Sequence, residues 1–420
     1  MKDYSITKEF FGGIIHDKKR SLNMKLDIFM MDFIELLENR YDKKAFMEKY
    51  DVEIKSLEIF DLFREMLDLG LYNRNYDFKS YANEDNVLSA PFRIFYDISY
   101  GCNLHCLHCF TDSGKKGDEE LSLEEKRAFV DQCVELGVGR ISIAGGEPFF
   151  CEDLFPFLDY CMEKKLGVSI TTNGTLLSKK NVERLNKYSI KTLTVSMDGA
   201  VKESCEAVRG KGTYKEIIEG LSNVCNYYKG AYSVKTTIMK NNLAEIEELI
   251  KIAIKYRCSS IKFNCVREDG RAEKNSNDII LSAEEYVNTI KLIENIKEKY
   301  KKEIRIKAPL NPFCNEQYTY INELGFGCFA GKESICVDPT GNVRPCSHFP
   351  DSFICGNVKK ETLTEIWRNS DVLNAFRKFS GNKECKECGF YDKCRGGCRY
   401  RAYLSGDING KDTYCYKYYS

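Results

Sequence analysis

Residues 93–110, RIFYDISYGCNLHCLHCF, join a strand-like apolar run to three closely spaced cysteines. Cys102, Cys106 and Cys109 form a C-x3-C-x2-C array. Thiolates are typical ligands of iron–sulfur clusters, and this compact spacing lets one loop wrap one cluster. Three thiolates on a four-iron cluster leave one iron open to bind another molecule. A structural zinc site is the alternative, but zinc normally takes four closed ligands from two short-spaced pairs.

The run at 93–100 is the first of six strand-like segments. The others are residues 139–146, 167–174, 192–199, 232–239 and 260–266. Amphipathic stretches of helical length separate them, such as residues 123–137 and 242–256. Strands that alternate with helices predict an α/β fold with a parallel sheet. Six strands are too few for a closed eight-stranded barrel. We therefore expect a partial (β/α)6 barrel with its ligand site at the C-terminal ends of the strands.

The composition of the 420 residues narrows the class of protein. Hydrophobic residues make up 43% and charged residues 30%, as in a globular chain with a full core. Lys+Arg and Asp+Glu both number 63, a balance that argues against nucleic acid as the main partner. We expect no membrane span and no secretory signal, because the sequence shows neither a long apolar run nor an apolar segment after the first lysine. The 20 cysteines therefore indicate metal or redox chemistry in the cytoplasm rather than disulfides.

Polar motifs follow the later strands. AGGEP at 144–148 ends the second strand, TTNGT at 171–175 the third and TVSMDG at 194–199 the fourth, and an arginine follows in VRGKGTY at 208–214. Together with the cysteine array, these motifs resemble the radical S-adenosylmethionine (radical SAM) family. The resemblance implies a catalytic [4Fe–4S] cluster on Cys102, Cys106 and Cys109, whose open iron binds S-adenosylmethionine (SAM). Reduction of the cluster would cleave SAM to a 5′-deoxyadenosyl radical, which abstracts a hydrogen atom from the substrate.

The same resemblance assigns SAM contacts to nine residues. They are His108 near the adenine, Gly145, Gly146, Glu147 and Pro148 at the methionyl amino group, Asn173, Ser196 and Asp198 at the strand ends that meet the ribose, and Arg209 at the carboxylate. Taken singly, the strand-end residues could be turn formers and the arginine a surface charge. The chain departs from the family pattern at Cys205-Glu206, where many relatives have His-Asp. A buried inert role for Cys205 is favoured over a hydrogen-atom donor or redox partner.

Seven cysteines near the C-terminus form a second pattern. Cys328 and Cys346 flank a turn signal at Gly341, and Cys385, Cys388, Cys394, Cys398 and Cys415 follow. The pattern resembles the SPASM extension of radical SAM enzymes, and a zinc ribbon is the alternative. The resemblance implies two auxiliary [4Fe–4S] clusters, one on Cys328, Cys346 and Cys398 and the other on Cys385, Cys388, Cys394 and Cys415, which makes three clusters in all. The fourth ligand of the first stays open between Cys314, Cys336 and a substrate thiolate.

The N-terminal residues 1–88 contain no cysteine. Residues 6–26 predict a small antiparallel sheet, and residues 26–40, 42–50 and 54–70 predict helices. This unit resembles the winged-helix RiPP recognition element, which would bind a leader peptide by adding a strand, using residues 21–26 and the helix at 54–69. A structural cap or dimerisation unit is the alternative. Residues 72–90 are interpreted as a linker, so we expect three domains: 1–88 for leader recognition, 89–310 for the radical SAM barrel and 311–420 for the SPASM region.

The three resemblances together predict a radical SAM maturase of a ribosomally made precursor peptide. Such an enzyme would install a cross-link, with a thioether between a Cys sulfur and a carbon favoured over a carbon–carbon bond, and epimerisation left open. Its partners would be a precursor peptide with a leader and an electron donor of flavodoxin or ferredoxin type, with neither nucleic acid nor membrane. The alternatives are an anaerobic sulfatase-maturing enzyme that forms formylglycine and, in another class, an iron–sulfur electron carrier or scaffold.

Overall fold

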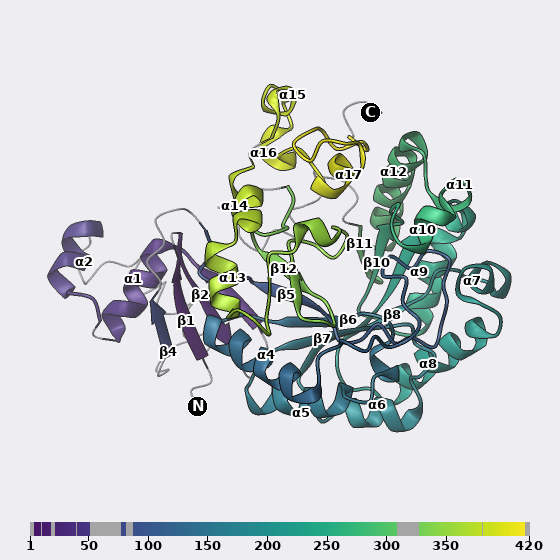
Figure 1. Cartoon of the computed structure of the whole chain (residues 1–420), viewed down its shortest axis with the longest axis horizontal. Coiled ribbons are helices and arrows are strands. Elements are labelled where there is room, and N and C mark those ends of the chain that lie inside the picture. Colours follow the sequence, from purple (N-terminus) through teal and green to yellow (C-terminus); the bar gives the residue numbers. More distant parts are fainter. Residues whose placement is uncertain are drawn as a thin grey trace. The chain divides into compact units, whose positions relative to one another are not determined.

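A computed structural model describes residues 4–9, 11–17, 22–38, 40–50, 77–80, 87–308, 327–379 and 381–415 (Figure 1). The chain divides into two compact units, Met1–Ser89 and Ala90–Ser420. The predicted boundary between residues 310 and 311 lies outside the described residues. Within the described ranges, no helix is both long and apolar enough to cross a membrane.

The first unit is a four-stranded sheet with two described helices. Its elements are β1 (Tyr4–Glu9), β2 (Gly12–Asp17), β3 (Leu22–Leu26), α1 (Ile28–Leu37), α2 (Lys43–Tyr50) and β4 (Asp77–Ser80). The strand order in this sheet is β3-β2-β1-β4. Strand β2 pairs antiparallel with β1 and with β3, and β4 pairs parallel with β1. The predicted antiparallel sheet and the first two helices are confirmed, whereas the predicted helix at 54–69 lies outside the described residues.

One sequence interpretation of this unit is wrong. Residues 72–90 are not a plain linker, because β4 lies within them and pairs with β1. Ser89 also binds back to the sheet, since its backbone N–H and its hydroxyl both donate to the buried carboxylate of Glu9. A strand of four residues that is added at a sheet edge carries too little alternation to be recognised in a polar, aromatic segment.

The second unit is built on one curved sheet. Its strands are β5 (Arg93–Asp97), β6 (Ile141–Ala144), β7 (Val168–Thr172), β8 (Ile190–Ser196), β9 (Tyr232–Ile238), β10 (Ser260–Cys265), β11 (Arg305–Lys307), β12 (Ser334–Val337), β13 (Asn342–Arg344) and β14 (Gly356–Asn357). Strands β5 to β11 are parallel and adjacent in chain order. All six predicted strands are confirmed, and β11 extends the sheet by one.

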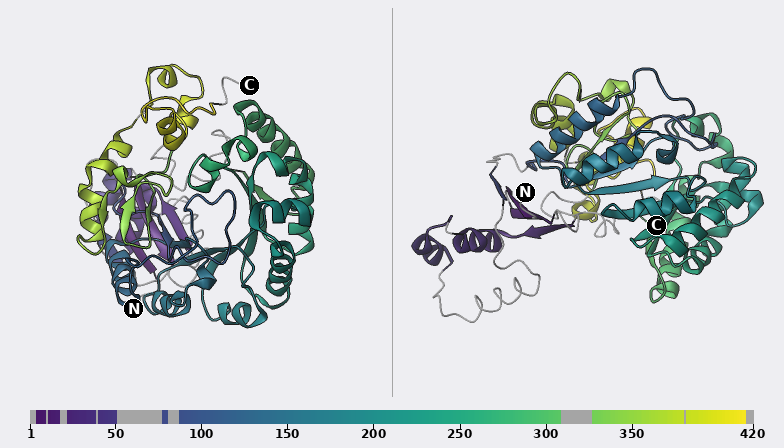
Figure 2. Two further views of the ribbon diagram at one scale, coloured as in Figure 1. Left: turned by 45° about the vertical axis from the view of Figure 1, so that its right-hand side comes forward. Right: turned by 90° about the horizontal axis from the view of Figure 1, so that it is seen from below.

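Helices cover the outer face of this sheet, as Figures 1 and 2 show. Those of the barrel are α4 (Leu123–Leu136), α5 (Leu154–Glu163), α6 (Lys179–Leu185), α7 (Lys202–Arg209), α8 (Thr213–Tyr227), α9 (Ile246–Lys255), α10 (Arg271–Lys274), α11 (Ser276–Ile279) and α12 (Ala283–Tyr300). The C-terminal region adds α13 (Leu363–Asn369), α14 (Asp371–Lys378), α15 (Lys383–Lys386), α16 (Tyr391–Cys394) and α17 (Arg399–Leu404). Helices between parallel strands leave the concave face and the strand ends for a site.

The C-terminal region continues the barrel sheet. Strand β12 pairs in parallel with β5, with Ile335 opposite Ile94, and β13 and β14 follow as antiparallel strands. The predicted hairpin around Gly341 is confirmed, and this glycine takes a φ of 88°, which favours glycine. The pairing places the C-terminal cysteine region beside the strand that leads into the first cysteine array.

Candidate functional site

The loop after β5 carries the first cysteine array and is held at several points. The backbone N–H of Cys102 donates to the carbonyl of Gly114 at 2.8 Å, and that of Leu107 donates to Val208 at 2.9 Å. The Arg271 side chain reaches the same loop from α10, where its Nε donates to the Cys106 carbonyl at 2.8 Å. Residues far apart in the sequence therefore hold this loop in one conformation.

The three thiols of this loop lie near one another. Burial raises the pKa of Cys106 to about 11, and the neighbouring Cys109 and Cys102 add to this rise. In the described part of the chain, no three thiol, imidazole or carboxylate groups converge on a point that could hold a single metal ion. A cluster places each thiolate on a different iron, so its ligands need not converge in this way. A set of three thiols in one loop suits a cluster in its donor chemistry.

The glycine pair after β6 packs against the start of the cysteine loop. A Cβ on Gly146 would lie 2.2 Å from the carbonyl oxygen of Gly101, and one on Gly145 would lie 2.5 Å from that of Ser99. Gly145 also has a φ of 111°. The backbone N–H of Gly146 donates to Ser99 at 2.8 Å. These glycines thus allow two backbone segments to approach as no other residue would.

We predict that Gly146→Ala disrupts this contact. The added methyl group overlaps backbone, so we expect the free energy of unfolding to fall by about 2 kcal/mol and SAM binding to weaken. Urea unfolding and equilibrium SAM binding would measure the two effects. Gly114→Ala is the matched control, because a Cβ there meets nothing within 4 Å. Equal behaviour of the two variants would show that the glycine pair is dispensable.

Glu147 and Asn173 join three loops at the strand ends. The Glu147 carboxylate is buried and accepts hydrogen bonds from the Thr172 hydroxyl and the Asn173 backbone, both at 2.6 Å. Burial raises the pKa of Glu147 even though these donors oppose the rise. The Asn173 amide donates to Asn103 in the cysteine loop at 2.9 Å. Pro148 begins a short 3-10 turn, Pro148–Phe150. The two predicted SAM contacts therefore also order the site itself.

Asp198, Arg209 and His108 form a buried ionic group. Arg209 Nη2 lies 2.6 Å and His108 Nε2 lies 3.1 Å from the same Asp198 oxygen, and the Thr237 backbone donates to the other at 2.7 Å. Burial alone would raise the pKa of Asp198, but Arg209 and His108 outweigh it and lower this pKa. Ser196 is half-buried at the end of β8, two residues before Asp198. Three sequence motifs, the cysteine loop with His108, the β8 end with Asp198 and the segment with Arg209, therefore meet in one ionic network.

This network leaves two polar atoms without a partner. His108 Nδ1 and Arg209 Nε are buried and make no hydrogen bond within the described structure. Unsatisfied buried polar atoms are rare, and a bound ligand is one reason for them. The Arg209 guanidinium also lowers the pKa of Cys106, which places it near the cysteine array. The residues present thus fit a ligand with polar groups that lies next to a cluster.

Cys205 is fully buried on α7, in the same region. Burial raises the pKa of its thiol to about 11, although the charge of Arg209 opposes the rise. A buried thiol that stays protonated is a poor nucleophile and metal ligand.

The first group of C-terminal cysteines lies around an aromatic cluster. Cys328, Cys346 and Cys398 all pack against a core formed by Ala330, Phe349, Phe376 and Tyr400. Burial raises the pKa of Cys346 to about 11, and Cys328 and Cys398 add to the rise. Cys336 lies near Cys346: burial raises the pKa of the Cys336 thiol, and Cys346 adds to this rise. Cys314 lies outside the described residues.

The second group of C-terminal cysteines lies on α15, α16 and the residues that follow. Burial raises the pKa of Cys394 to about 11, and Cys415 and Cys385 add to the rise. Cys388 acts on the pKa of Cys385 in the same way. The structure thus brings together the same two groups of thiols that the family resemblance implies.

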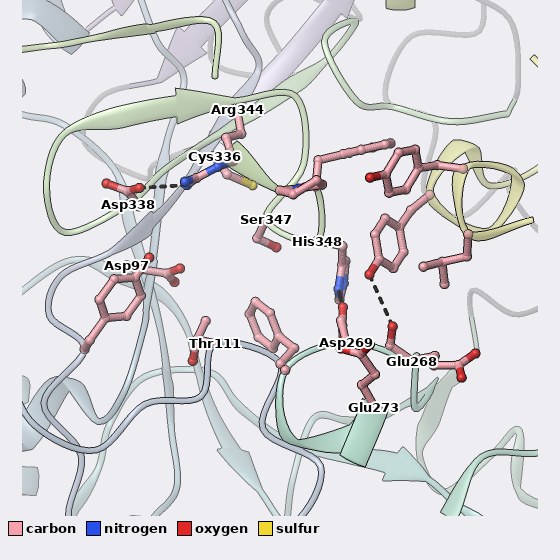
Figure 3. A pocket seen from close by; sticks show the side chains of 18 residues that line it. Asp97, Thr111, Glu268, Asp269, Glu273, Cys336, Asp338, Arg344, Ser347 and His348 are labelled. Atoms are coloured by element: carbon pink, nitrogen blue, oxygen red, sulfur yellow. Dashed lines mark hydrogen bonds and ion pairs between the residues drawn. The ribbon is translucent and has the colours of Figure 1, made fainter. Parts of the chain in front are cut away.

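A cavity of about 650 Å³ lies between the cysteine loop and the C-terminal region (Figure 3). Phe110 and Thr111 line it from the loop, and His348 lines it from beyond β13. His348 Nδ1 bonds to Asp269, and the His348 ring makes tilted contacts with the rings of Phe110 and Tyr400, with centroid distances of 5.0 Å and 5.3 Å. The cavity therefore adjoins the cysteine loop through Phe110 and the C-terminal region through Cys336 and His348.

Asp97, at the end of β5, lines the same cavity. Its side chain is 8% exposed and makes no hydrogen bond or ion pair with any described residue. Burial raises the pKa of Asp97 to about 7, and the nearby Asp338 adds to the rise, whereas Arg344 and Lys235 oppose it. Sequence reasoning missed this residue, because a single acid at a strand end carries no motif.

We predict a pH dependence that comes from Asp97. Because its folded pKa lies above the unfolded value, Asp97 destabilises the fold progressively as the pH rises from the unfolded pKa to the folded pKa of about 7, and the loss is nearly complete above that pH. Asp97→Asn should therefore gain about 1 kcal/mol relative to the wild type between pH 6 and pH 8. Urea unfolding at both pH values checks this. A constant difference would show that Asp97 does not titrate in this range.

Comparisons with known proteins give a consistent result. A model of the radical SAM superfamily matches residues 96–253. The chain carries a radical SAM domain. A SPASM model, an iron–sulfur cluster-binding domain, matches residues 328–389. The radical SAM domain therefore contains the first cysteine array and the glycine pair, and the SPASM match contains four of the seven C-terminal cysteines: Cys328, Cys346, Cys385 and Cys388.

Two curated proteins and one solved structure are examples of what this chain is similar to. The mycofactocin maturase MftC of Mycobacterium tuberculosis is 26% identical over 78% of this chain and 83% of its own. The AdoMet-dependent heme synthase of Methanosarcina barkeri is 29% identical over 78% and 97%. The crystal structure of Streptococcus suis SuiB bound to the precursor peptide SuiA superposes with a TM-score of 0.76 at 20% identity, covering 98% of both chains. The last likeness shows that the fold is shared along nearly the whole chain.

Arg271 is the other functional residue that sequence reasoning missed. It follows β10, more than 150 residues after the loop that it holds, and it also binds the Ser113 carbonyl and Asp112. An isolated arginine in a polar segment carries no spacing signal.

Proposed function

We propose that this radical SAM enzyme modifies a ribosomally made precursor peptide. The observation that carries the proposal is the match to SuiB, which was solved with its precursor peptide and which aligns with 98% of this chain. A match of that extent includes the first unit, Met1–Ser89. The two curated relatives named above cover 78% of the chain. An additional N-terminal unit is what a leader-guided enzyme needs and what an enzyme on a small molecule does not.

The proposal assigns three [4Fe–4S] clusters and SAM to the grouped residues. Cys102, Cys106 and Cys109 would hold the catalytic cluster, Cys328, Cys346 and Cys398 one auxiliary cluster, and Cys385, Cys388, Cys394 and Cys415 the other. When bound, the reduced catalytic cluster and SAM supply the 5′-deoxyadenosyl radical that abstracts hydrogen. His108, Gly145, Gly146, Glu147, Pro148, Asn173, Ser196, Asp198 and Arg209 would bind and orient SAM. The loop contacts of Arg271 and Glu147 would hold these groups in place and exclude water.

The first unit would bind the leader along β3. This strand lies at one edge of the sheet, with β2 on its other side. An open strand edge offers backbone groups that an extended peptide can pair with. The helix at 54–69, which was expected to complete this surface, lies outside the described residues.

The reaction would form a cross-link, with a thioether favoured over a carbon–carbon bond. Cys336, which lines the cavity and lies near Cys346, supports a role for the C-terminal region in accepting an electron or binding a substrate sulfur. Sulfatase maturation is the alternative reaction, and it would not need the first unit. We place the enzyme in the reducing cytoplasm, with a flavodoxin- or ferredoxin-type protein as electron donor, because low-potential clusters require both.

The test is the intact mass of a short Cys-containing peptide encoded beside this gene, after anaerobic co-expression with the enzyme. Loss of two hydrogens per site, together with resistance of the thiols to alkylation, would establish a thioether. The same loss with free thiols would indicate a carbon–carbon link. An unchanged mass, with SAM cleavage intact, would move the proposal to sulfatase maturation or epimerisation and would count first against the leader-binding role of the first unit.

A further inference from the structure

The cavity between the cysteine loop and the C-terminal region is lined by more acidic than basic side chains. The acids are Asp97, Glu268, Asp269, Glu273 and Asp338, and the bases are Arg344 and His348. Burial lowers the pKa of His348, so its ring carries no charge at neutral pH. Figure 3 shows Asp97 on one side of the cavity and Glu268 and Glu273 on the other. Carboxylates therefore face the cavity from two sides.

Two of the five acids already have partners within the lining. Asp338 lies 2.7 Å from Arg344 Nη1, and Asp269 bonds to His348. The other three make no hydrogen bond or ion pair through their side chains with any residue that the structure describes: Asp97, Glu268 and Glu273. Glu268 and Glu273 are exposed, so water solvates them. Asp97 lacks this compensation.

Asp97 is a buried carboxylate without a counter-ion. Its side chain is 8% exposed and points into the cavity (Figure 3). Burial and the charge of Asp338 raise its pKa by more than Arg344 and Lys235 lower it. Arg344 is already bound, and Lys235 is not part of the cavity lining. An unpaired buried charge costs stability, and residues that break a folding rule in this way are typical of functional sites.

Both acidic sides of the cavity adjoin elements assigned to the cluster or to SAM. A Cβ on Gly145 would lie 3.3 Å from the Cβ of Asp97, so Asp97 is next to the glycine pair. On the other side, the backbone N–H of Arg271 donates to the Cys109 carbonyl at 2.9 Å. This bond holds the segment 268–273 against the cysteine loop. A side chain in this cavity would therefore lie beside both elements.

Aromatic rings form much of the remaining lining: Tyr100, Phe110, Phe349, Tyr400 and Tyr403. The face of an aromatic ring attracts a cation, and the attraction is stronger when the cation is desolvated. Rings together with carboxylates suit a positively charged side chain with an apolar stem better than an anionic one. The volume of about 650 Å³ is in the range of small-ligand sites and is ample for one such side chain.

We propose that this cavity binds a positively charged side chain of the peptide substrate, a lysine or an arginine, with Asp97 as its counter-ion. The inference rests on the proposed function and adds the class of substrate residue that the barrel selects. Glu268 and Glu273 would attract the cation at the exposed side, and Asp97 would bind it at the buried side. Ammonium and guanidinium groups form charge-assisted hydrogen bonds with a carboxylate. The bound side chain would thus fix the register of the core peptide beside the cysteine loop.

The amino group of SAM is another cation near Asp97, because Gly145 is assigned to it. Glu147, in the same motif, is the carboxylate assigned to that amino group. A single ammonium group at the glycine pair would leave Glu268 and Glu273, across the cavity, without a cation. We therefore assign Asp97 to the substrate, and the experiment separates the two sources.

Carboxyl labelling tests the proposal without any turnover. The cluster-loaded enzyme would be treated anaerobically at pH 7 with a water-soluble carbodiimide, and modification of each carboxyl read by mass spectrometry. n-Propylguanidinium is the cationic probe, and n-propylurea, of the same shape, is its neutral counterpart, each with and without SAM. We expect the cation to lower modification of Asp97 several-fold and the urea to leave it unchanged. Glu219, exposed on the outer helix α8, is the reference site.

Variants separate a built site from general ionic effects. Glu273→Gln should weaken the protection of Asp97 about threefold at low ionic strength, and Glu219→Gln should change nothing. In a peptide that the enzyme modifies, exchange of the bound lysine or arginine for methionine should raise KM about tenfold. The same exchange should have no effect in Asp97→Asn, because the contact is already lost. A merely structural role of Asp97 would not produce this coupling.

Four results would overturn the proposal: no modification of Asp97 without a probe, no protection by n-propylguanidinium, equal protection by n-propylurea, or full protection by SAM alone with nothing added by the cation. The last would assign Asp97 to the amino group of SAM. Because labelling needs no peptide, a protected Asp97 beside an unmodified peptide would count against the proposed function and not against the cation site.

Discussion

Replacing Cys106 by Ala should abolish SAM cleavage and reduce 5′-deoxyadenosine formation to the background of the assay. Two thiolates do not hold a four-iron cluster with one iron left open, so the redox centre of the radical SAM domain is lost. If the chain holds the three proposed clusters, the variant should also lose about a third of the bound iron, because two of them would remain. Anaerobic incubation with dithionite and SAM, followed by chromatography and iron analysis, measures both quantities.

The control for this variant is Cys225→Ala. Cys225 lies near the C-terminal end of α8, where its sulfur accepts a hydrogen bond from Arg257 at 3.1 Å. It belongs to neither of the cysteine groups assigned to clusters. Its loss should leave SAM cleavage and iron content unchanged. Cleavage that survives in Cys106→Ala would mean that the first cysteine array is not the catalytic centre, and it would revive an iron–sulfur carrier as the alternative.

The second large effect is expected for Asp198→Asn. The neutral amide would leave the Arg209 guanidinium buried without its counter-charge, which costs about 3 kcal/mol in the free energy of unfolding. The sign follows from the lowered pKa of Asp198: its stabilising contribution is present above the unfolded pKa, and hence at neutral pH, and is lost on acidification. SAM affinity should fall as well, because His108 and Arg209 lose their common anchor.

Asp131→Asn provides the comparison. Asp131 also pairs with a cation, Lys164 at 2.7 Å, but its side chain is 48% exposed. Solvent screens such a pair, so the loss should stay below about 1 kcal/mol. Urea unfolding midpoints of the two cluster-loaded variants would compare their losses of stability, and SAM binding would be measured in parallel. Similar small losses in both variants would show that the Asp198 network is not an important part of the site.

Much of this fold could be predicted because its signals are local. Alternating apolar residues gave each of the six barrel strands, and amphipathic stretches of helical length gave the helices between them. The cysteine array and the glycine pair were recognisable for the same reason, since each function lies within one short loop. Strand β4 could not be recognised, because four residues at a sheet edge depend on their partner strand and not on their own pattern.

The sequence by itself determined the fold class, the cysteine groups and the motifs at the strand ends, because spacing along the chain fixes which groups share a loop. The tertiary structure alone decided which of these groups meet. It joined Asp198 to His108 and Arg209, brought Arg271 to the cysteine loop, and paired β12 with β5. Such contacts depend on strand register and on the curvature of the sheet, and neither is written in any single segment.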